Sequence, residues 1–266
     1  MIDLHCHMLP GIDDGAKDLE TSLAMARMAV ADGITITACT PHITPGIYDN
    51  TGPGIRRAVQ ALREVFERES IPLKLAPGAD VHLAPNLSEG LKSGMLQSLN
   101  GSRYFLFEPP HHVAPPRLED AVFDVMAGGW QPIFTHPERL TWIENHYQTI
   151  VNIAEAGAWM QITAGSLTGT FGKRARYWGE RMIDEGLVHI LATDAHNLKA
   201  RSPVLSAGVQ AVEAKLGAEA ARDMVVTRPL AVLRNNPPES VPAAVGLPPE
   251  ACKKKWELFG LFRRPQ

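Results

Sequence analysis

The sequence predicts an α/β protein in which parallel strands are joined by crossover helices. Short apolar or β-branched runs alternate with amphipathic stretches about seven times along the chain, and this alternation is typical of a parallel sheet covered by helices. No Gly-x-Gly-x-x-Gly follows the first strand and no phosphate-loop motif is present, which disfavours nucleotide binding. The sheet could be closed into a barrel or open and doubly wound.

The expected strands are short. The segment ITITACT is rich in β-branched residues, and LKLAPGADV reads as a strand with a glycine break. YFLFE, PIFTH, AWMQI and VHILATD have a similar character, as do the first five residues. In chain order, the expected strands lie at 1–5, 34–40, 73–81, 104–108, 132–136, 158–162 and 188–194.

The expected helices carry apolar residues at intervals of three and four. The pattern within 18–32 ends at Gly33, a typical stop signal. The segment 55–69 is the clearest amphipathic case, with the apolar stripe Ile55, Val59, Leu62 and Phe66. Further helical stretches lie at 117–128, 147–156, 173–185, 203–216 and 217–234.

Composition limits the classes of protein. The chain has 266 residues, 45% of them hydrophobic, and a net charge of −3, which is ordinary for a globular protein and unsuited to holding nucleic acid. Three widely spaced cysteines predict a reducing compartment without a disulfide framework. The N-terminus lacks the pattern of a signal peptide and no apolar run is long enough to span a membrane, so we expect a cytoplasmic protein.

The chain changes character near residue 235. We expect a domain over 1–235, followed by a proline-rich linker and a basic, aromatic tail over 236–266. The tail ACKKKWELFGLFRRPQ could lie on an anionic membrane surface. Alternatively, its aromatic residues fold back onto the protein.

Polar side chains stand where the expected strands end, and chemistry in parallel α/β folds gathers at that edge. Alternate residues of a strand project to one side, so the pairs in HCH and DAH each share a face. The loop after the first strand adds Asp13 and Asp14. The candidates at the strand ends are His5, His7, His42, Asp80, Glu108, His136, Asp194 and His196.

This convergence predicts a metal site. With Asp14, five histidines and four carboxylates are available, too many for a single ion that takes about four to six ligands. Two or three divalent ions would suit them, and mixed imidazole and oxygen ligands favour Mn²⁺, Fe or Zn²⁺ over Ca²⁺. Cys6 lies between His5 and His7 and should point the opposite way. Such ions activate water and clamp phosphoryl or carbonyl oxygens.

Two arginines follow these residues. Arg139 comes three residues after His136, and Arg201 comes five after His196. Their guanidinium groups are placed to bind phosphate oxygens, although surface salt bridges would explain them equally well.

The motifs LHCHMLPGIDDG, TPH, THPER and TDAH, with acidic residues at 80 and 108, resemble the polymerase-and-histidinol-phosphatase (PHP) superfamily. Within it they are most similar to bacterial capsule-type protein-tyrosine phosphatases, over residues 1 to about 235. The resemblance implies a distorted barrel of seven strands and phosphotyrosine hydrolysis by a metal-bridging hydroxide. It also implies a partner, the phosphorylated tail of a membrane tyrosine autokinase of polysaccharide export.

The resemblance also assigns ligands and substrate contacts. It implies one ion bound by His5, His7, Asp80 and Asp194, a second by Asp80, Glu108 and His136, and a third by Asp14, His42 and His196. Arg139 and Arg201 match the phosphate-contacting arginines of the family. No cysteine has an arginine six positions later, which agrees with the absence of a phosphocysteine intermediate.

One position departs from the family, which usually has glutamate where this chain has Asp80. The shorter side chain puts bridging between the first two ions in question. Two other functions therefore stay open: a small-molecule phosphatase or phosphodiesterase, for example for histidinol phosphate, and a non-catalytic kinase-binding protein. His82, His111, His112 and Tyr48 could touch substrate or line the pocket mouth, although a place on the rim or a surface role explains them as well, whereas His146 and His189 are expected to be structural or on the surface.

Overall fold

The computed structural model describes residues 1–248 and contains strands that pair in parallel throughout. Within these residues, a three-stranded sheet has the order β1-β2-β4 and a six-stranded sheet the order β3-β5-β6-β7-β8-β9. The strands are β1 (Ile2–Cys6), β2 (Ile36–Cys39), β3 (His42–Ile43), β4 (Lys74–Pro77), β5 (Asp80–His82), β6 (Tyr104–Glu108), β7 (Gln131–Thr135), β8 (Trp159–Thr163) and β9 (Val188–Ala192). The predicted parallel α/β class is confirmed.

The chain passes from one sheet to the other near residues 40 and 78. The expected strand 34–40 contains β2, and β3 begins two residues after its predicted end, whereas the expected strand 73–81 is divided into β4 and β5. The glycine break in the second is Gly78, where a Cβ would lie 2.8 Å from Leu99 Cδ2. Backbone hydrogen bonds continue through both breaks, from Thr40 N to Cys6 O and from Asp80 N to Pro41 O.

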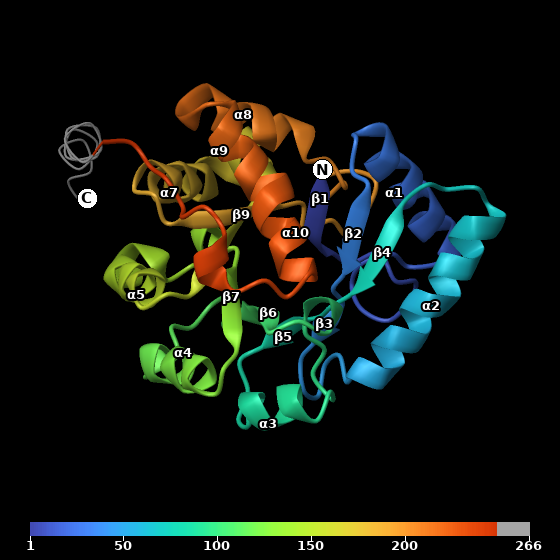
Figure 1. Ribbon diagram of the computed structural model, residues 1–266, viewed down its shortest axis with the longest axis horizontal. Helices are drawn as coiled ribbons and strands as arrows, with labels where there is room; N and C mark the ends of the chain where they lie inside the picture. The colour runs from blue at the N-terminus through green and yellow to red at the C-terminus, as the bar shows by residue number, and fades with distance from the viewer. Residues whose placement is uncertain (249–266) are drawn as a thin grey trace.

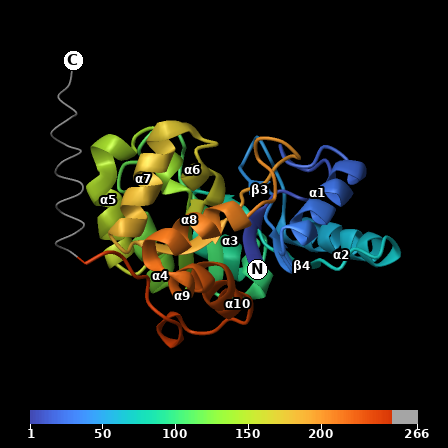
Figure 2. The same cartoon turned by 90° about the horizontal axis from the view of Figure 1, so that it is seen from above.

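The helices surround the strands. In Figure 1, α1 and α2 flank β1, β2 and β4, while α4, α5 and α7 lie outside the other sheet, and the view in Figure 2 agrees. The helices that follow the predicted stretches are α1 (Leu19–Ala31), α2 (Gly52–Arg68), α4 (Leu118–Ala127), α5 (Ile143–Glu155), α7 (Gly172–Asp184), α8 (Ser206–Leu216), α9 (Ala218–Arg222) and α10 (Arg228–Leu233). A π-helical turn, Asp223–Thr227, joins α9 to α10. Two short helices, α3 (Leu87–Lys92) and α6 (Ala164–Thr168), were not predicted.

Local chemistry explains the longest of these helices. The Thr51 side chain accepts a hydrogen bond from Gly54 N at 3.3 Å and so caps α2. The predicted stripe from Ile55 to Phe66 is buried, as expected for an amphipathic helix packed on a sheet.

Alternate strand residues enter two hydrophobic clusters. In β6, Phe105 and Phe107 belong to the larger cluster, under the helices. Tyr104 and Leu106, on the opposite face, belong to a smaller cluster. Its larger side chains lie at the amino ends or in the middle of the strands, such as Tyr104, Trp159 and Ile133, and only alanines represent it near the carboxyl ends.

Residues 236–248 fall in the segment predicted as a proline-rich linker. Leu247 N donates to Asp184 O at 2.8 Å, and Tyr104 Oη donates to Asn236 O at 2.7 Å. The expected tail, residues 251–266, lies outside the described residues. Among the residues described, no helix combines the length and apolarity needed to cross a membrane.

Candidate metal centre

The end of β1 aims His5 and His7 in one direction. The register of β1 against β2 shifts between Asp3 and Cys6, and such a bulge re-aims the side chains that follow it. Cys6 is buried in the larger hydrophobic cluster, so it points away from the two imidazoles, as predicted.

Two further candidates adopt a left-handed backbone. His136 follows β7 with φ 35°, and Asp194 comes two residues after β9 with φ 49°. Non-glycine residues rarely adopt this conformation, and those that do are often found at functional sites. Backbone bonds fix both turns, from His136 N to Gln161 O and from Asp194 N to His5 O, each at 2.8 Å.

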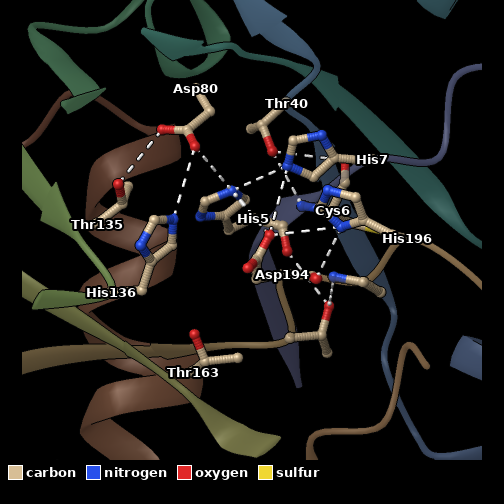
Figure 3. Close-up of polar contacts among 12 residues, drawn as sticks. His5, Cys6, His7, Thr40, Asp80, Thr135, His136, Thr163, Asp194 and His196 are labelled. Atoms are coloured by element: carbon tan, nitrogen blue, oxygen red, sulfur yellow. Dashed lines mark hydrogen bonds and ion pairs between the residues drawn. The ribbon is translucent and has the colours of Figure 1, made fainter. Parts of the chain in front are cut away.

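Four buried side chains form what we call the inner group: His5, His7, Asp80 and Asp194. His5 Nε2 lies 3.1 Å from His7 Nε2, 3.4 Å from Asp80 Oδ2 and 3.3 Å from Asp194 Oδ1 (Figure 3). Imidazole nitrogens this close to each other and to carboxylates can share a proton or a cation, because two neutral lone pairs would repel.

Asp80 also faces a second set of side chains. Its Oδ2 lies 3.6 Å from His42 Nδ1 and 3.8 Å from His136 Nε2. The Glu108 carboxylate approaches the same two rings, at 3.2 Å from His42 Nδ1 and 3.8 Å from His136 Nε2. One carboxylate oxygen of Asp80 therefore reaches three imidazoles despite the short side chain.

The outer group consists of His7, Asp14, His42 and His196, whose candidate ligand atoms all lie within 4.8 Å of one another. Asp14 Oδ1 is 3.2 Å from His196 Nε2 and 3.5 Å from His42 Nε2. The Asp14 side chain is 44% exposed, whereas the inner group is dry. The outer group therefore forms the open side of the centre.

The nine candidate ligands from the sequence thus lie in one continuous cluster. The distances differ from the expected sets in two respects. His7 belongs to the outer group as well as the inner one, and His42 contacts Asp80 and Glu108 as well as Asp14.

The chemistry of the cluster fits divalent cations. Asp80 Oδ2, His42 Nδ1 and His196 Nε2 are buried, and although each lies 3.2–3.4 Å from a charged neighbour, none makes a hydrogen bond. Buried polar atoms are normally hydrogen-bonded or bound to a ligand, and a cation would satisfy these. Burial alone would lower the pKa of His5, but Asp80 and Asp194 outweigh it and raise this pKa to about 9. At His42, Glu108 and Asp80 likewise overcome burial and raise the pKa to about 10. The electrostatic potential created by these carboxylates therefore favours positive charge in the cluster.

The opposite shift at His196 fits a ligand. Burial, reinforced by His7, lowers its pKa to about 4. Its ring is therefore neutral near pH 7, as a metal-binding imidazole must be. The ring is oriented by the Asp194 carbonyl oxygen, 3.0 Å from its Nδ1.

Gln161 supports the inner group and was not among the predicted site residues. Its Oε1 lies 2.8 Å from His5 Nδ1, so it accepts the proton at that nitrogen and leaves Nε2 directed at the cluster. Its sequence signal was a polar residue within the apolar strand AWMQI.

The two predicted arginines meet at Asp194. Arg139 donates to Asp194 Oδ2, and Arg201 donates to the same oxygen at 2.8 Å. The Arg139 guanidinium also lies over the Phe171 ring, 4.3 Å from its centroid. The alternative of surface salt bridges is wrong, because their shared partner is a buried residue of the cluster.

The remaining predicted residues lie at different distances from the cluster. Tyr48 stacks on His42 with ring centroids 5.6 Å apart and an angle of 16°, and His82 Nδ1 lies 3.6 Å from Glu108. Burial, reinforced by His136 and Arg139, lowers the pKa of His111 to about 4. His146 packs against Trp142 and His189 against Trp159, as structural residues.

Fold and site together define a class: a parallel α/β protein whose strand ends gather imidazoles and carboxylates suited to divalent cations. Residues 1–234 match the capsular polysaccharide synthesis family CpsB/CapC. The chain belongs to this family, which confirms the resemblance to capsule-type phosphatases predicted from the motifs.

Individual relatives agree over nearly the whole chain. It is 35% identical to the tyrosine-protein phosphatase YwqE of Bacillus subtilis over 262 residues, covering 98% of this chain and 100% of YwqE. It is 28% identical to the tyrosine-protein phosphatase CpsB of Streptococcus pneumoniae, covering 88% of this chain and 98% of CpsB. A crystal structure from work on YwqE and CpsB, described as unique metal-dependent tyrosine phosphatases, matches with a TM-score of 0.87 and 35% identity, over 93% of this chain and 99% of the other.

Proposed function

We propose that this protein is a metal-dependent phosphatase that hydrolyses phosphotyrosine in proteins. The observation that carries the proposal is the approach of His5 Nε2 and His7 Nε2 to 3.1 Å beside two buried carboxylates. YwqE and CpsB, both named tyrosine-protein phosphatases, support the reaction. The description of their structures as metal-dependent supports the chemistry.

The proposed ligands form three sets that share side chains. The first consists of His5, His7, Asp80 and Asp194, the second of Asp80, Glu108 and His136, and the third of Asp14, His42 and His196. The reach of Asp80 Oδ2 to His5, His42 and His136 supports a bridging role for aspartate where the family usually has glutamate. The contacts of His7 with the outer group support its sharing between the first and third sets.

We propose Mn²⁺ as the metal, with Fe or Zn²⁺ as alternatives, because the donors are imidazole nitrogens and carboxylate oxygens. When bound, such ions lower the pKa of coordinated water and neutralise charge on phosphoryl oxygens. His5, His7, Asp80 and Asp194 would hold them in a dry pocket, and Gln161 would keep His5 in the binding tautomer.

Arg139 and Arg201 are proposed to bind the phosphate. Each guanidinium has five N–H donors, so pairing with Asp194 leaves donors for phosphate oxygens. The two side chains are 15% and 24% exposed, so a substrate can approach them.

A cysteine nucleophile is not supported by the described cysteines. Cys6 and Cys39 are buried, and burial raises the pKa of the Cys39 thiol to about 12. A thiolate at that position would be disfavoured at neutral pH.

We also propose that the two sheets close into a distorted (β/α)7 barrel. The hydrogen bonds that continue from β2 into β3 and from β4 into β5 allow each pair to count as one interrupted strand. A parallel bridge between Cys6 and Ala195 supports closure between β1 and the end of β9. Closure would bring the polar strand ends into a ring.

The proposed substrate is the phosphorylated tail of a tyrosine kinase of polysaccharide export, in the cytoplasm. The capsular family of the chain supports this context, and the two buried free cysteines suit a reducing compartment. The barrel domain would extend over 1–235. Residues 236–248 are hydrogen-bonded along it, and the basic, aromatic residues that follow them in the sequence are proposed as a membrane contact.

The test is hydrolysis of a phosphotyrosine peptide and of para-nitrophenyl phosphate by metal-stripped protein, with and without added Mn²⁺. We expect activity only with metal, and loss of activity on chelation. His136→Ala should abolish turnover without unfolding the protein. Faster hydrolysis of histidinol phosphate would favour a metabolite phosphatase, and inactivity on every phosphate with metal bound would favour a binding protein.

A further inference from the structure

Asp13 is a buried carboxylate that none of the proposed ligand sets uses. Its side chain is fully shielded from solvent, and its two oxygens accept hydrogen bonds from three places. Oδ2 lies 2.7 Å from His7 Nδ1 and 3.1 Å from His42 N, and Oδ1 lies 3.0 Å from Gly15 N. One side chain thus joins the end of β1, the loop after it and the start of β3.

The hydrogen bond with His7 determines which ring nitrogen is free to face the cluster. Because the Asp13 carboxylate accepts the proton on Nδ1, the lone pair of His7 remains on Nε2. That atom lies 3.1 Å from His5 Nε2 and 3.5 Å from Asp194 Oδ1. Without this acceptor, the proton could move to Nε2 and block it as a ligand.

The contact with Gly15 fixes the loop that carries Asp14. Residue 15 packs so closely on His7 that a Cβ there would lie 2.2 Å from the His7 carbonyl oxygen. Ala16 N also donates to His7 O at 3.0 Å. Asp14 lies between Asp13 and these two anchored residues, although its own side chain is the most exposed in the outer group.

The contact with His42 fixes the start of β3, the third segment that Asp13 joins. The backbone nitrogen of His42 begins β3, at the break where the predicted strand passes between the two sheets. The position of this residue therefore depends on a side-chain acceptor. Asn50 adds a second tie, since its Nδ2 donates to His42 O at 2.9 Å and to Ile12 O at 3.0 Å.

From these contacts we infer that Asp13 is the positioning residue of the outer group: it orients His7 and sets the places of Asp14 and His42, three of the four members. This inference rests on the proposed function, because it concerns an ion held by these residues. Asp13 is not itself placed as a ligand, since both of its oxygens face N–H donors.

The test compares Asp13→Asn with Asp18→Asn in the full chain, by calorimetric titration of metal-stripped protein with Mn²⁺. Asp18 is the matched control, because its carboxylate accepts from Thr21 N at 2.8 Å and holds the first turn of α1 instead. In Asp13→Asn, the amide NH₂ would face one of the N–H groups that now donate to the carboxylate, and that hydrogen bond would be lost. We therefore expect the affinity of the outer-group site for Mn²⁺ to weaken by about 10- to 100-fold. The site formed by His5, His7, Asp80 and Asp194 shares His7 and should weaken less. The site formed by Asp80, Glu108 and His136, and every site of Asp18→Asn, should keep their affinity.

Several outcomes would overturn the inference. If Asp13→Asn weakens no site, or weakens all sites equally, Asp13 does not act on the outer group, and the proposed metal-dependent function stands. If the unaltered protein binds no Mn²⁺ or Zn²⁺, the proposed function fails as well.

A second measurement does not depend on the variant folding. Nitrogen-15 NMR of the His7 ring in the unaltered protein should show the proton on Nδ1, with Mg²⁺ or Zn²⁺ replacing paramagnetic Mn²⁺. A proton on Nε2 would contradict the inference.

Discussion

The two ends of the strands differ in how their polar groups are satisfied. At the carboxyl ends, Asp80 Oδ2, His42 Nδ1 and His196 Nε2 are buried without a hydrogen-bond partner. At the amino ends, the buried guanidinium of Arg228 donates to three carbonyl oxygens, those of Pro242, Ala243 and His189, at 2.8, 2.6 and 3.1 Å. One end is therefore closed by its own chain, and the other leaves polar atoms that a bound cation would satisfy.

The comparison shows how one fold separates stability from function. Tyr104 and Trp159, near the amino ends, belong to the smaller hydrophobic cluster with Val232 of α10. Neutral packing and satisfied donors stabilise that end, whereas buried charged groups and polar atoms without a hydrogen bond are concentrated at the other. Substitutions at the two ends should consequently affect different measurements.

The largest expected effect is at the carboxyl end. Glu108→Gln keeps the shape but removes a charge that faces His42 and His136, so we expect kcat/KM with Mn²⁺ to fall about 1000-fold, or about 4 kcal/mol. The melting temperature of the metal-free variant should change by only a few degrees. A parallel loss of stability and activity would show that the two ends are not separable.

At the amino end, Arg228→Met should lower the free energy of unfolding by about 3 kcal/mol, because three carbonyl oxygens lose their donor. Urea unfolding of metal-free protein measures this effect. The exposed Arg222 provides the control Arg222→Met, which should change little. Both variants should keep kcat/KM per folded molecule. A lower kcat/KM in Arg228→Met alone would show that the amino end also affects activity, which contradicts the separation of the two ends.

A pH-dependent effect should also arise at the amino end. Burial, reinforced by Arg228, lowers the pKa of His189 to about 4, from an ordinary value of 6.5. As pH falls from 6.5 toward 4, the unfolded chain gains a proton that the folded protein does not, so stability is lost in that window. His189→Gln should remove about 2 to 3 kcal/mol of this loss between pH 7.5 and 4.5. Identical pH dependence of unfolding in both proteins would contradict this assignment.

The smallest effect concerns the mouth of the site. Tyr48 stacks on His42 and could support the ring of an aryl phosphate, an interaction worth about 1 kcal/mol. Tyr48→Leu should therefore lower kcat/KM about 3- to 10-fold for a phosphotyrosine peptide and leave glycerol phosphate hydrolysis unchanged. Tyr48→Phe is the control and should retain the preference. An equal loss on both substrates would instead indicate that Tyr48 acts through His42.

Much of the fold could be predicted because it depends on local patterns. The β-branched segment at 34–40 and the stripe from Ile55 to Phe66 indicated their elements directly. The glycine in LKLAPGADV likewise indicated the break after Pro77. The break after Cys39 was harder to locate, because the chain passes between sheets there only in response to its neighbours. The short helix α6, Ala164–Thr168, has too few residues to show a period.

The candidate site could be predicted from the sequence for a related reason. Parallel strands bring their carboxyl ends to one edge, so a histidine or carboxylate at six of the seven expected strand ends predicted a cluster before any distance was known. Gln161 and the role of Asp13 escaped this reasoning, because a supporting side chain is recognised by the partner it contacts.

The sequence by itself determined the order of strands and helices, the face on which each side chain lies, and which residues can meet at the strand ends. Only the tertiary structure decided that His7 belongs to both groups, that Asp80 reaches three imidazoles, and that both arginines share Asp194. The physical reason is that periodicity along the chain fixes the direction of a side chain. The distance between side chains on different strands depends instead on the register and curvature of the sheets, and these arise from contacts between residues far apart in the sequence.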